Sequence, residues 1–401
     1  MSQDPLVPTF VLRGHSSAIH ALEFFASNTF LASGDTDGWL VIWRLSSKRP
    51  VAVWKAHEGG VMQIKQWTGQ RLITHGRDHK LRVWQVRNED FEVLSTKLPS
   101  ESPSAAQTQH PQPWLLHSLD VNALNFCAFS VCDQYPEQAP ASPMNPTPQL
   151  LASPNGLDSG GIDIFQLPSE RRVSQLRSDP AVDTGMVMSV ALFHSLELQE
   201  ELVLVSGYED GQVMVHTCCG AFDHKSQGWV KVLMGKPHSQ PVLSLDVFPS
   251  KRHFVTSSAD AIIAKFSLDP NETRLESSQN AEKAINTKHA GQQGLNVRSD
   301  GKIFATAGWD GRIRVYSCKT MKELAVLKWH KDGCYATSFA KILIHNQNDG
   351  SGEEVHGEGT KIATRMSALD HIKQERENKA RSLHWLAAGG KDAKITLWEV
   401  Y

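Results

Sequence analysis

Histidine, serine or threonine, and aspartate recur together in this sequence at a nearly constant spacing. A histidine stands 21 or 22 residues before an aspartate, and a serine or threonine stands four residues before the same aspartate. These side chains can form a catalytic triad, in which histidine takes the proton of a hydroxyl nucleophile. The four sets are His15, Ser33 and Asp37; His57, Thr74 and Asp78; His238, Thr256 and Asp260; and His289, Thr306 and Asp310. Identical catalytic sets in several copies would serve no purpose, so the repetition favours a structural use.

The structural interpretation rests on how a buried carboxylate is stabilised. A buried aspartate is costly unless its lone pairs accept hydrogen bonds, and an imidazole N–H together with turn amides can supply them. A fully bonded polar network inside a protein then fixes one packing arrangement. The sequence therefore predicts that each set is a buried network that holds one repeat together.

The repeats themselves have the pattern of β-strands. In residues 40–43 the apolar side chains alternate with the period of a strand, and the segment closes on Trp43, six residues after Asp37. Further copies of the pattern occur at 206–210 and 388–392. The copies lie about 40 residues apart, which is the spacing of a four-stranded propeller blade.

Seven blades account for the pattern, with a fold that is all-β. The blades are expected to begin near His15, His57, Trp114, Met186, His238, His289 and His330. The early apolar segment 9–12 is a strand without a blade, and the final blade lacks a fourth strand. We expect this segment to pair into the last blade and close the ring, which removes two exposed edges. Residues 1–401 are thus predicted to form a single β-propeller domain.

Three insertions interrupt the repeat. Residues 88–113 and 133–149 are rich in Ser, Pro and Gln, and residues 346–382 begin with a run of polar residues and glycine. Such composition is typical of mobile loops. Within the third insertion, the charged stretch 367–383 has the composition of a surface helix.

Composition argues against several classes of function. The 41 Lys and Arg residues are balanced by 43 Asp and Glu residues, so no basic footprint for nucleic acid is present. No leader peptide and no apolar run of about 18 residues occurs, so no membrane contact is expected. The six cysteines form no CxxC pair and favour free thiols in a reducing compartment.

Signatures of cofactor, metal or small-molecule sites are missing as well. Cys218 and Cys219 lie close to His216, but a strand end is a better interpretation than a metal site. No phosphate loop, nucleophile elbow or zinc-protease motif occurs in the chain. We therefore expect no enzyme activity, no cofactor, no metal and no small-molecule substrate.

The repeats resemble the WD-repeat family over almost the whole chain. Gly14-His15 and the closing residues Trp43 and Trp84 match its two signature ends, although Arg44 and Gln85 replace the aspartate that follows the tryptophan in that family. In the family, one His, Ser or Thr, Asp and Trp of a blade form a hydrogen-bonded tetrad. The resemblance implies the tetrads His15, Ser33, Asp37, Trp43 and His57, Thr74, Asp78, Trp84.

Three longer segments carry a narrower resemblance. Residues 8–15, 57–61 and 386–398 together are similar to the fungal ASTRA-associated WD-repeat family. That resemblance implies a non-catalytic scaffold, a subunit of the ASTRA assembly that is linked to chromatin remodelling and to the maturation of phosphatidylinositol-kinase-related kinases. It also implies protein subunits as the partners, and residence in the nucleus with the cytoplasm as a second location.

Two other binding functions remain as alternatives. Trp84-Gln85-Val86-Arg87 is similar to the Trp-Asp-x-Arg box of substrate receptors of cullin-type ubiquitin ligases, although Gln85 replaces the aspartate. An ordinary strand end explains the same residues. A G-protein β-like signalling scaffold would need a long N-terminal helix for a γ partner, whereas the first strand is expected to begin already at Thr9.

A set of large side chains marks the expected partner-binding face. By the family resemblance, turns between the second and third strands of the blades surround one mouth of the central channel. These turns usually hold Gly, Asn, Asp or Ser, but here they carry Trp39, Arg77, His79, Tyr208 and Trp309. Aromatic residues and arginine contribute most of the binding energy at interfaces. The alternative for Trp39 and Trp309 is packing against neighbouring blades.

Overall fold

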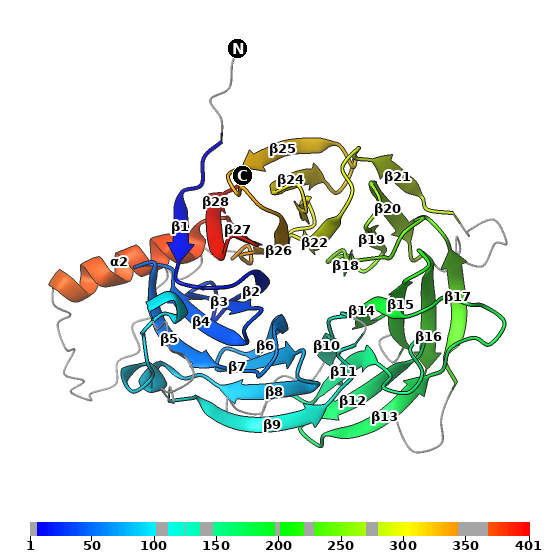
Figure 1. Cartoon of the computed structure of the whole chain (residues 1–401), viewed down its shortest axis with the longest axis horizontal. Helices are drawn as coiled ribbons and strands as arrows, with labels where there is room; N and C mark the ends of the chain where they lie inside the picture. The colour runs from blue at the N-terminus through cyan, green and yellow to red at the C-terminus, as the bar shows by residue number, and fades with distance from the viewer. Residues whose placement is uncertain are drawn as a thin grey trace, which may run out of the picture.

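The chain forms a closed ring of seven antiparallel sheets (Figure 1). The computed structural model describes residues 6–101, 111–124, 126–136, 147–196, 201–219, 228–269, 280–343 and 368–401. Each of the seven sheets has four strands. The prediction of an all-β, seven-bladed propeller is confirmed.

The first four blades follow one another along the chain. Blade 1 contains β2 (Ile19–Phe25), β3 (Phe30–Asp35), β4 (Trp39–Arg44) and β5 (Arg49–Lys55). Blade 2 contains β6 (Val61–Thr68), β7 (Arg71–Gly76), β8 (Lys80–Gln85) and β9 (Trp114–Asp120). Blade 3 contains β10 (Ser130–Asp133), β11 (Gln149–Pro154), β12 (Ile162–Leu167) and β13 (Arg171–Leu176). Blade 4 contains β14 (Val187–His194), β15 (Glu201–Tyr208), β16 (Val213–Cys219) and β17 (Val230–Gly235).

The remaining three blades complete the ring. Blade 5 contains β18 (Ser244–Val247), β19 (His253–Ser257), β20 (Ile262–Ser267) and β21 (Lys283–Asn286). Blade 6 contains β22 (Gln292–Val297), β23 (Ile303–Gly308), β24 (Arg312–Ser317) and β25 (Glu323–Lys328). Blade 7 contains β26 (Cys334–Phe339), β27 (Trp385–Gly390), β28 (Lys394–Glu399) and β1 (Phe10–Arg13). The helical elements with described bounds are η1 (Asn88–Glu92), η2 (Pro99–Glu101) and α2 (Ala368–Ser382).

The core lies between adjacent blades, so the middle strands bury both of their faces. In β4, five of the six residues are fully buried, which explains its unbroken apolar sequence. Between blades 1 and 2, the indole rings of Trp54 and Trp84 meet edge to face, with centroids 5.9 Å apart. Such aromatic pairs contribute beyond the apolar area that they bury.

The N-terminal strand closes the ring, as predicted. Strand β1 pairs antiparallel with β28, with Phe10 opposite Leu397 and Arg13 opposite Lys394. Leu12 is only 2% exposed and joins the apolar cluster that also contains Leu397. Blade 7 is therefore built from both ends of the sequence.

The predicted start of the third blade at Trp114 is wrong. Residues Trp114–Asp120 form β9, which pairs with β8 as the outer strand of blade 2. Blade 3 begins instead at Ser130. The insertion 88–113 separates the third and fourth strands of one blade, whereas the sequence interpretation had placed it between blades. The count of seven blades is unaffected.

The described part of that insertion, residues 88–101, packs on the ring. Leu94 is buried against blade 1, and the Ser95 carbonyl accepts a hydrogen bond of 2.7 Å from the Val53 amide. The Ser100 amide donates to the carbonyl of Gly14 at 3.0 Å. The remainder of this insertion and much of those at 133–149 and 346–382 lie outside the described residues.

Helix α2 confirms the predicted charged surface helix and is fastened at its C-terminal end. The buried side chain of Asn28, in the β2–β3 turn, donates hydrogen bonds to the carbonyls of Lys341 (2.7 Å) and Arg381 (3.1 Å). The indole of Trp385 donates to the Ala380 carbonyl at 2.8 Å. The rest of the helix projects away from the ring (Figure 1).

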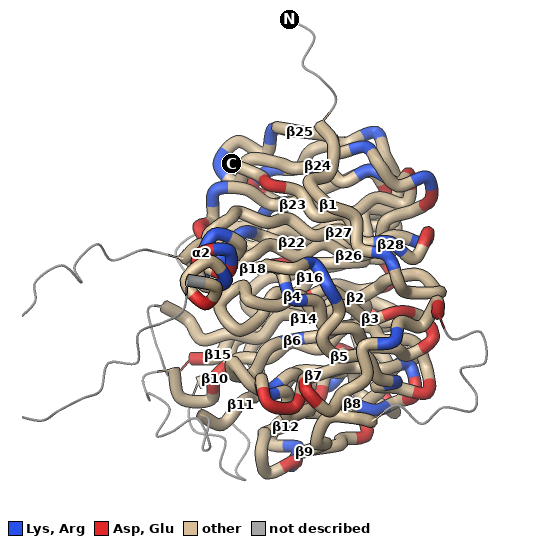
Figure 2. Tube along the Cα trace, turned by 90° about the vertical axis from the view of Figure 1, so that its left-hand side faces the viewer, with Lys and Arg blue, Asp and Glu red and all other residues tan. Residues whose placement is uncertain are grey.

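Charges of both signs are interspersed over the side of the molecule drawn in Figure 2, and α2 carries both. All six cysteines are free. None of the helices in the described ranges has the length and apolarity needed to cross a bilayer.

Candidate functional site

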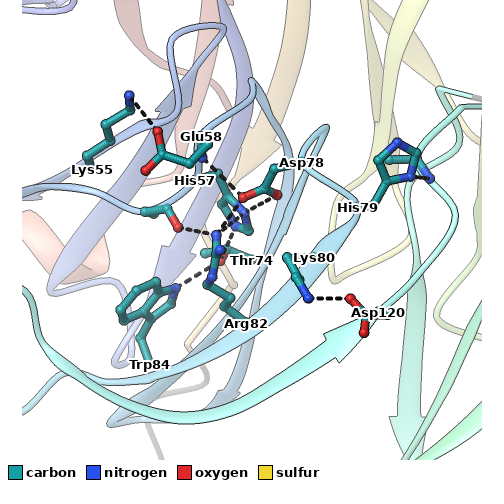
Figure 3. A network of polar contacts seen from close by, with 12 residues as sticks. Lys55, His57, Glu58, Thr74, Asp78, His79, Lys80, Arg82, Trp84 and Asp120 are labelled. Carbon is teal, nitrogen blue, oxygen red and sulfur yellow. Dashed lines mark hydrogen bonds and ion pairs between the residues drawn. The ribbon is translucent and has the colours of Figure 1, made fainter.

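The network in blade 2 shows what the repeated polar residues do (Figure 3). His57 Nδ1 lies 2.9 Å from Asp78 Oδ1, and His57 Nε2 lies 2.7 Å from Thr74 Oγ1. The indole N–H of Trp84 donates to the same hydroxyl at 2.9 Å. These contacts fit a neutral imidazole that donates from Nδ1 to the carboxylate and accepts the threonine proton at Nε2. The second predicted tetrad is therefore present.

Electrostatics keep this network in one protonation state at neutral pH. Burial opposes ionisation of Asp78, but hydrogen bonds from His57, the Glu58 amide and Arg82 outweigh it, so the pKa of Asp78 lies well below its usual value. Burial also lowers the pKa of His57, although Asp78 partly opposes this. Arg82 donates to Asp78 Oδ2 at 2.7 Å (Figure 3). The carboxylate is thus charged and the imidazole neutral.

Blade 1 has the same network, but with a different aspartate from the one predicted. His15 contacts Asp35 Oδ2 and Ser33 Oγ at 2.7 Å each, and Trp43 donates to Ser33 at 2.8 Å. Asp35 is fully buried and also accepts backbone hydrogen bonds. The predicted Asp37 is exposed, and its carboxylate accepts a hydrogen bond from Ser17 instead. The assignment of Asp37 to the tetrad is therefore wrong.

Asp35 and Asp37 should differ in their contributions to stability. The change Asp35→Ala leaves a buried imidazole and two turn amides without their acceptor, so we expect it to lower the free energy of unfolding by about 2–4 kcal/mol. The matched change Asp37→Ala, only two positions away but exposed, should alter it by less than about 0.5 kcal/mol. Urea unfolding followed by circular dichroism measures both. Equal losses in the two variants would return Asp37 to the network.

Blade 5 retains three members of the predicted set. His238 Nδ1 lies 3.3 Å from Asp260 Oδ1, and His238 Nε2 lies 2.8 Å from Thr256 Oγ1. Phe266 takes the place of the tryptophan and stacks on Phe254. His238 therefore connects the threonine and the aspartate although no indole donates to the threonine.

The set predicted in blade 6 does not form. The side chain of His289 is 47% exposed, and its Nδ1 lies 3.7 Å from Asp310, which instead receives Arg314 at 2.6 Å. Thr306 donates to Gln292 at 2.7 Å, so a buried amide fills the place of the imidazole. The spacing of His289 and Asp310 did not by itself produce the network. Gln292 bonds to Thr306 and Arg314 pairs with Asp310, so neither group needs the imidazole.

Blade 7 contains a tetrad that the sequence interpretation missed. His330 lies 2.9 Å from Asp392 and 3.0 Å from Thr396, to which Trp398 donates at 2.9 Å. The hydroxyl comes from the third strand, because Thr396 faces Ala388, which occupies the usual serine position in the second strand. A threonine two residues before the closing tryptophan was the signal that could have revealed it.

These networks are arranged for packing. Where the sets form, the histidine and the hydroxyl lie inside the blades. The hydroxyls of these sets are fully buried, so they contribute to packing and are not presented to solvent: Ser33, Thr74, Thr256 and Thr396. Among the described residues, no three His, Cys, Asp or Glu side chains converge as a metal site.

The predicted partner-binding residues divide into two groups. Trp39 and Tyr208 are buried, 5% and 3% exposed, so they pack between blades and cannot present a binding surface. Their assignment as partner-binding residues is wrong. Arg77, His79 and Trp309 are exposed. Trp309 donates from its indole to Gln293 at 2.8 Å, which holds the ring in place.

The ring encloses a channel of about 600 Å³, and Arg77 lies at one of its mouths. The guanidinium of Arg77 stacks 4.0 Å from the centroid of Phe126, and the rings of His20 and Tyr335 stack at 4.6 Å. All four side chains line the channel. We call this set, Arg77, Phe126, His20 and Tyr335, the channel mouth.

The protein is a WD-repeat β-propeller. It has seven four-stranded blades, the N-terminal strand β1 closes the ring by pairing with β28, and buried His–Asp networks hold several blades together. The chain belongs to the family described as ASTRA-associated protein 1, which matches residues 8–398.

Curated relatives in this family are similar over nearly the full length of the chain. ASTRA-associated protein 1 of Aspergillus niger is 47% identical, with 100% of this chain and 98% of the relative covered. The protein of the same name from Penicillium rubens is also 47% identical with the same coverage. The relative from Schizosaccharomyces pombe is 33% identical over 83% of this chain and 93% of its own length.

Proposed function

We propose that this protein is a non-catalytic scaffold subunit of the ASTRA assembly and that it docks its partners on the face of the ring that carries Arg77 and Trp309. The name that the relatives share supports the association with ASTRA. One observation supports the scaffold role. The His–Asp networks bond within the blades, whereas the large side chains of Arg77 and Trp309 are exposed. Chromatin remodelling and kinase maturation are the processes that we expect the assembly to serve.

Affinity purification of a tagged chain tests this function. We expect the wild-type protein to recover ASTRA subunits, identified by mass spectrometry. The double change Arg77→Ala with Trp309→Ala should lower that recovery, because arginine and tryptophan are the side chains that most often dominate interface energy. The melting temperature should stay within about 2 °C of wild type, since both residues are exposed.

A matched control removes the same residue types elsewhere. Trp114 in β9 is 73% exposed, and Arg171 in β13 is exposed on the outer strand of the next blade. The double change Trp114→Ala with Arg171→Ala should leave recovery unchanged. Undiminished recovery by the folded Arg77 and Trp309 variant would place the docking site on another surface.

The same purification separates the rival function. In the segment that is similar to a ubiquitin-ligase box, the Arg87 guanidinium forms an ion pair with Asp90 at 3.2 Å, at the start of η1. That contact supports the ordinary strand-end interpretation. Recovery of cullin adaptors in place of ASTRA subunits would favour the ligase receptor. We also propose residence in the nucleus, which a fluorescent fusion would reveal.

A further inference from the structure

We propose that the channel mouth binds an acidic peptide, in which a carboxylate side chain pairs with Arg77 and a neighbouring apolar side chain packs against Phe126 and Tyr335. This inference rests on the proposed function as a docking protein, and it specifies the chemistry of the partner. Its four residues come from blade 1, the β7–β8 turn, the connection before β10, and blade 7.

The first observation is a guanidinium that has its donors free. Arg77 donates no hydrogen bond and enters no ion pair within the described part of the chain. Its plane is nevertheless held by the stacking contact with Phe126 at 4.0 Å. A stacked guanidinium keeps its N–H groups directed outward at its edge, and little conformational freedom is lost when they bind an acceptor.

The second observation is the charge of the channel. Its other charged lining residues are Lys65 and Asp246; Lys65 pairs with Glu23 at 3.5 Å, and Asp246 accepts the Val297 amide at 2.7 Å. Glu23 and Asp246 both interact electrostatically with Lys65, so this lysine is not an unpaired cation. Burial, aided by Arg77, lowers the pKa of His20 to about 4, so this imidazole is neutral at pH 7. The mouth therefore presents a single cation.

One cation favours a carboxylate over a nucleic acid. The planar fork of arginine matches the two oxygens of a carboxylate, and the resulting pair is frequently bidentate. Nucleic-acid binding relies on several Lys and Arg contacts to successive phosphates, and the described lining residues provide none beyond Arg77 at this mouth. Charge complementarity thus selects a Glu or Asp side chain.

Apolar groups beside Arg77 favour a peptide ligand over a small anion. Phe126, which stacks on the guanidinium, is 59% exposed, and Leu124, two residues before it in the sequence, is 65% exposed. Met62 and Met188 also line the channel, and methionine adapts to varied apolar side chains. A volume near 600 Å³ lies within the range of ligand pockets, about 300–1,000 Å³, and admits a few side chains.

Phage display of random heptapeptides against the full chain tests the inference. We expect the selected peptides to carry Asp or Glu beside an aromatic or branched aliphatic residue. The fluorescein-labelled consensus peptide should bind Arg77→Ala about tenfold more weakly than wild type, and replacing its acid by the matching amide should weaken binding to wild type by a similar factor. The two changes together should weaken binding no more than either alone. Arg171→Ala should bind like wild type.

Several results would overturn the inference. They are selection of no peptide, selection of peptides without acids, or equal binding by Arg77→Ala and wild type. Tighter binding of single-stranded oligo-dT that is lost in Arg77→Ala would assign the mouth to nucleic acid instead. If wild type and Arg77→Ala recover ASTRA subunits equally while no acidic peptide is selected, the scaffold function stands and this inference alone fails.

Discussion

Deleting residues 1–13 is expected to lower the melting temperature by about 10 °C or more and to make the protein associate. The deletion removes β1, so the backbone groups of β28 that pair with it lose their partners. It also removes Leu12 from the core, which alone contributes about 1.5–3 kcal/mol. An unpaired edge strand is a template for pairing with another chain. Differential scanning fluorimetry and size-exclusion chromatography measure the two effects.

Two matched variants separate ring closure from a general effect of truncation. Deleting residues 1–7 leaves β1 intact and should change the melting temperature by less than about 2 °C. Leu12→Asp places a charge in the core and should reproduce most of the loss, whereas Phe10→Asp, at a 40% exposed position, should not. A 1–13 deletion that melts like the full chain would show that β1 does not hold the ring.

Lowering the pH from 6.5 towards 3 is expected to destabilise the protein, and His75 should account for one proton of that dependence. His75 is fully buried in β7, and neither ring nitrogen has a hydrogen-bond partner among the described residues. Burial, with a smaller contribution from His57, lowers its pKa from 6.5 to about 3. The unfolded chain therefore binds a proton below pH 6.5 that the folded chain does not accept until about pH 3.

The sign and size follow from this difference. Above pH 6.5, His75 is neutral in both the folded and the unfolded chain, and its protonation does not lower the free energy of unfolding. As the pH falls below 6.5, the unfolded chain binds the proton first, so the free energy of unfolding decreases. One proton corresponds to a slope of about 1.4 kcal/mol per pH unit between pH 6 and 4. His75→Leu should reduce the slope of unfolding free energy against pH by that amount. His20 and His216, each with a pKa lowered to about 4 chiefly by burial, keep the variant acid-sensitive.

Urea titrations at several pH values measure these slopes. His384→Leu, at an exposed position, is the matched control and should keep the wild-type slope. Equal slopes for His75→Leu and wild type would mean that His75 is hydrated or bonded in the folded protein.

The spacing of residues along the sequence was enough to predict the blades, but not which carboxylate completes each network. In blade 2 the position two residues after Thr74 is Gly76, where a Cβ atom would lie 2.2 Å from His57 Nδ1. Glycine there makes room for Asp78. Blade 1 has Asp35 at this position, and its own carboxylate fills the room. The missing glycine, rather than the position of Asp37, was the informative difference.

Strand order within a blade was harder to predict than the number of blades. Strand β9 has the alternation of any strand, and only its hydrogen bonds to β8 show that it closes blade 2. The burial of aromatic residues next to turns was equally hard to predict from the sequence. Trp39 is the first residue of β4 and joins the cluster that contains Ile19, a contact between segments that residue type does not encode.

The closure by β1 also sets an order of events during synthesis. Phe10 and its partner Leu397 are 387 positions apart in the sequence. At the roughly 5–20 residues per second at which chains are made, the partner leaves the ribosome about 20–80 s after β1 does. For that interval the nascent chain carries an apolar strand, Phe10–Arg13, whose place in the ring does not yet exist. A chaperone that acts on this protein during translation would therefore meet its first strand as the exposed segment.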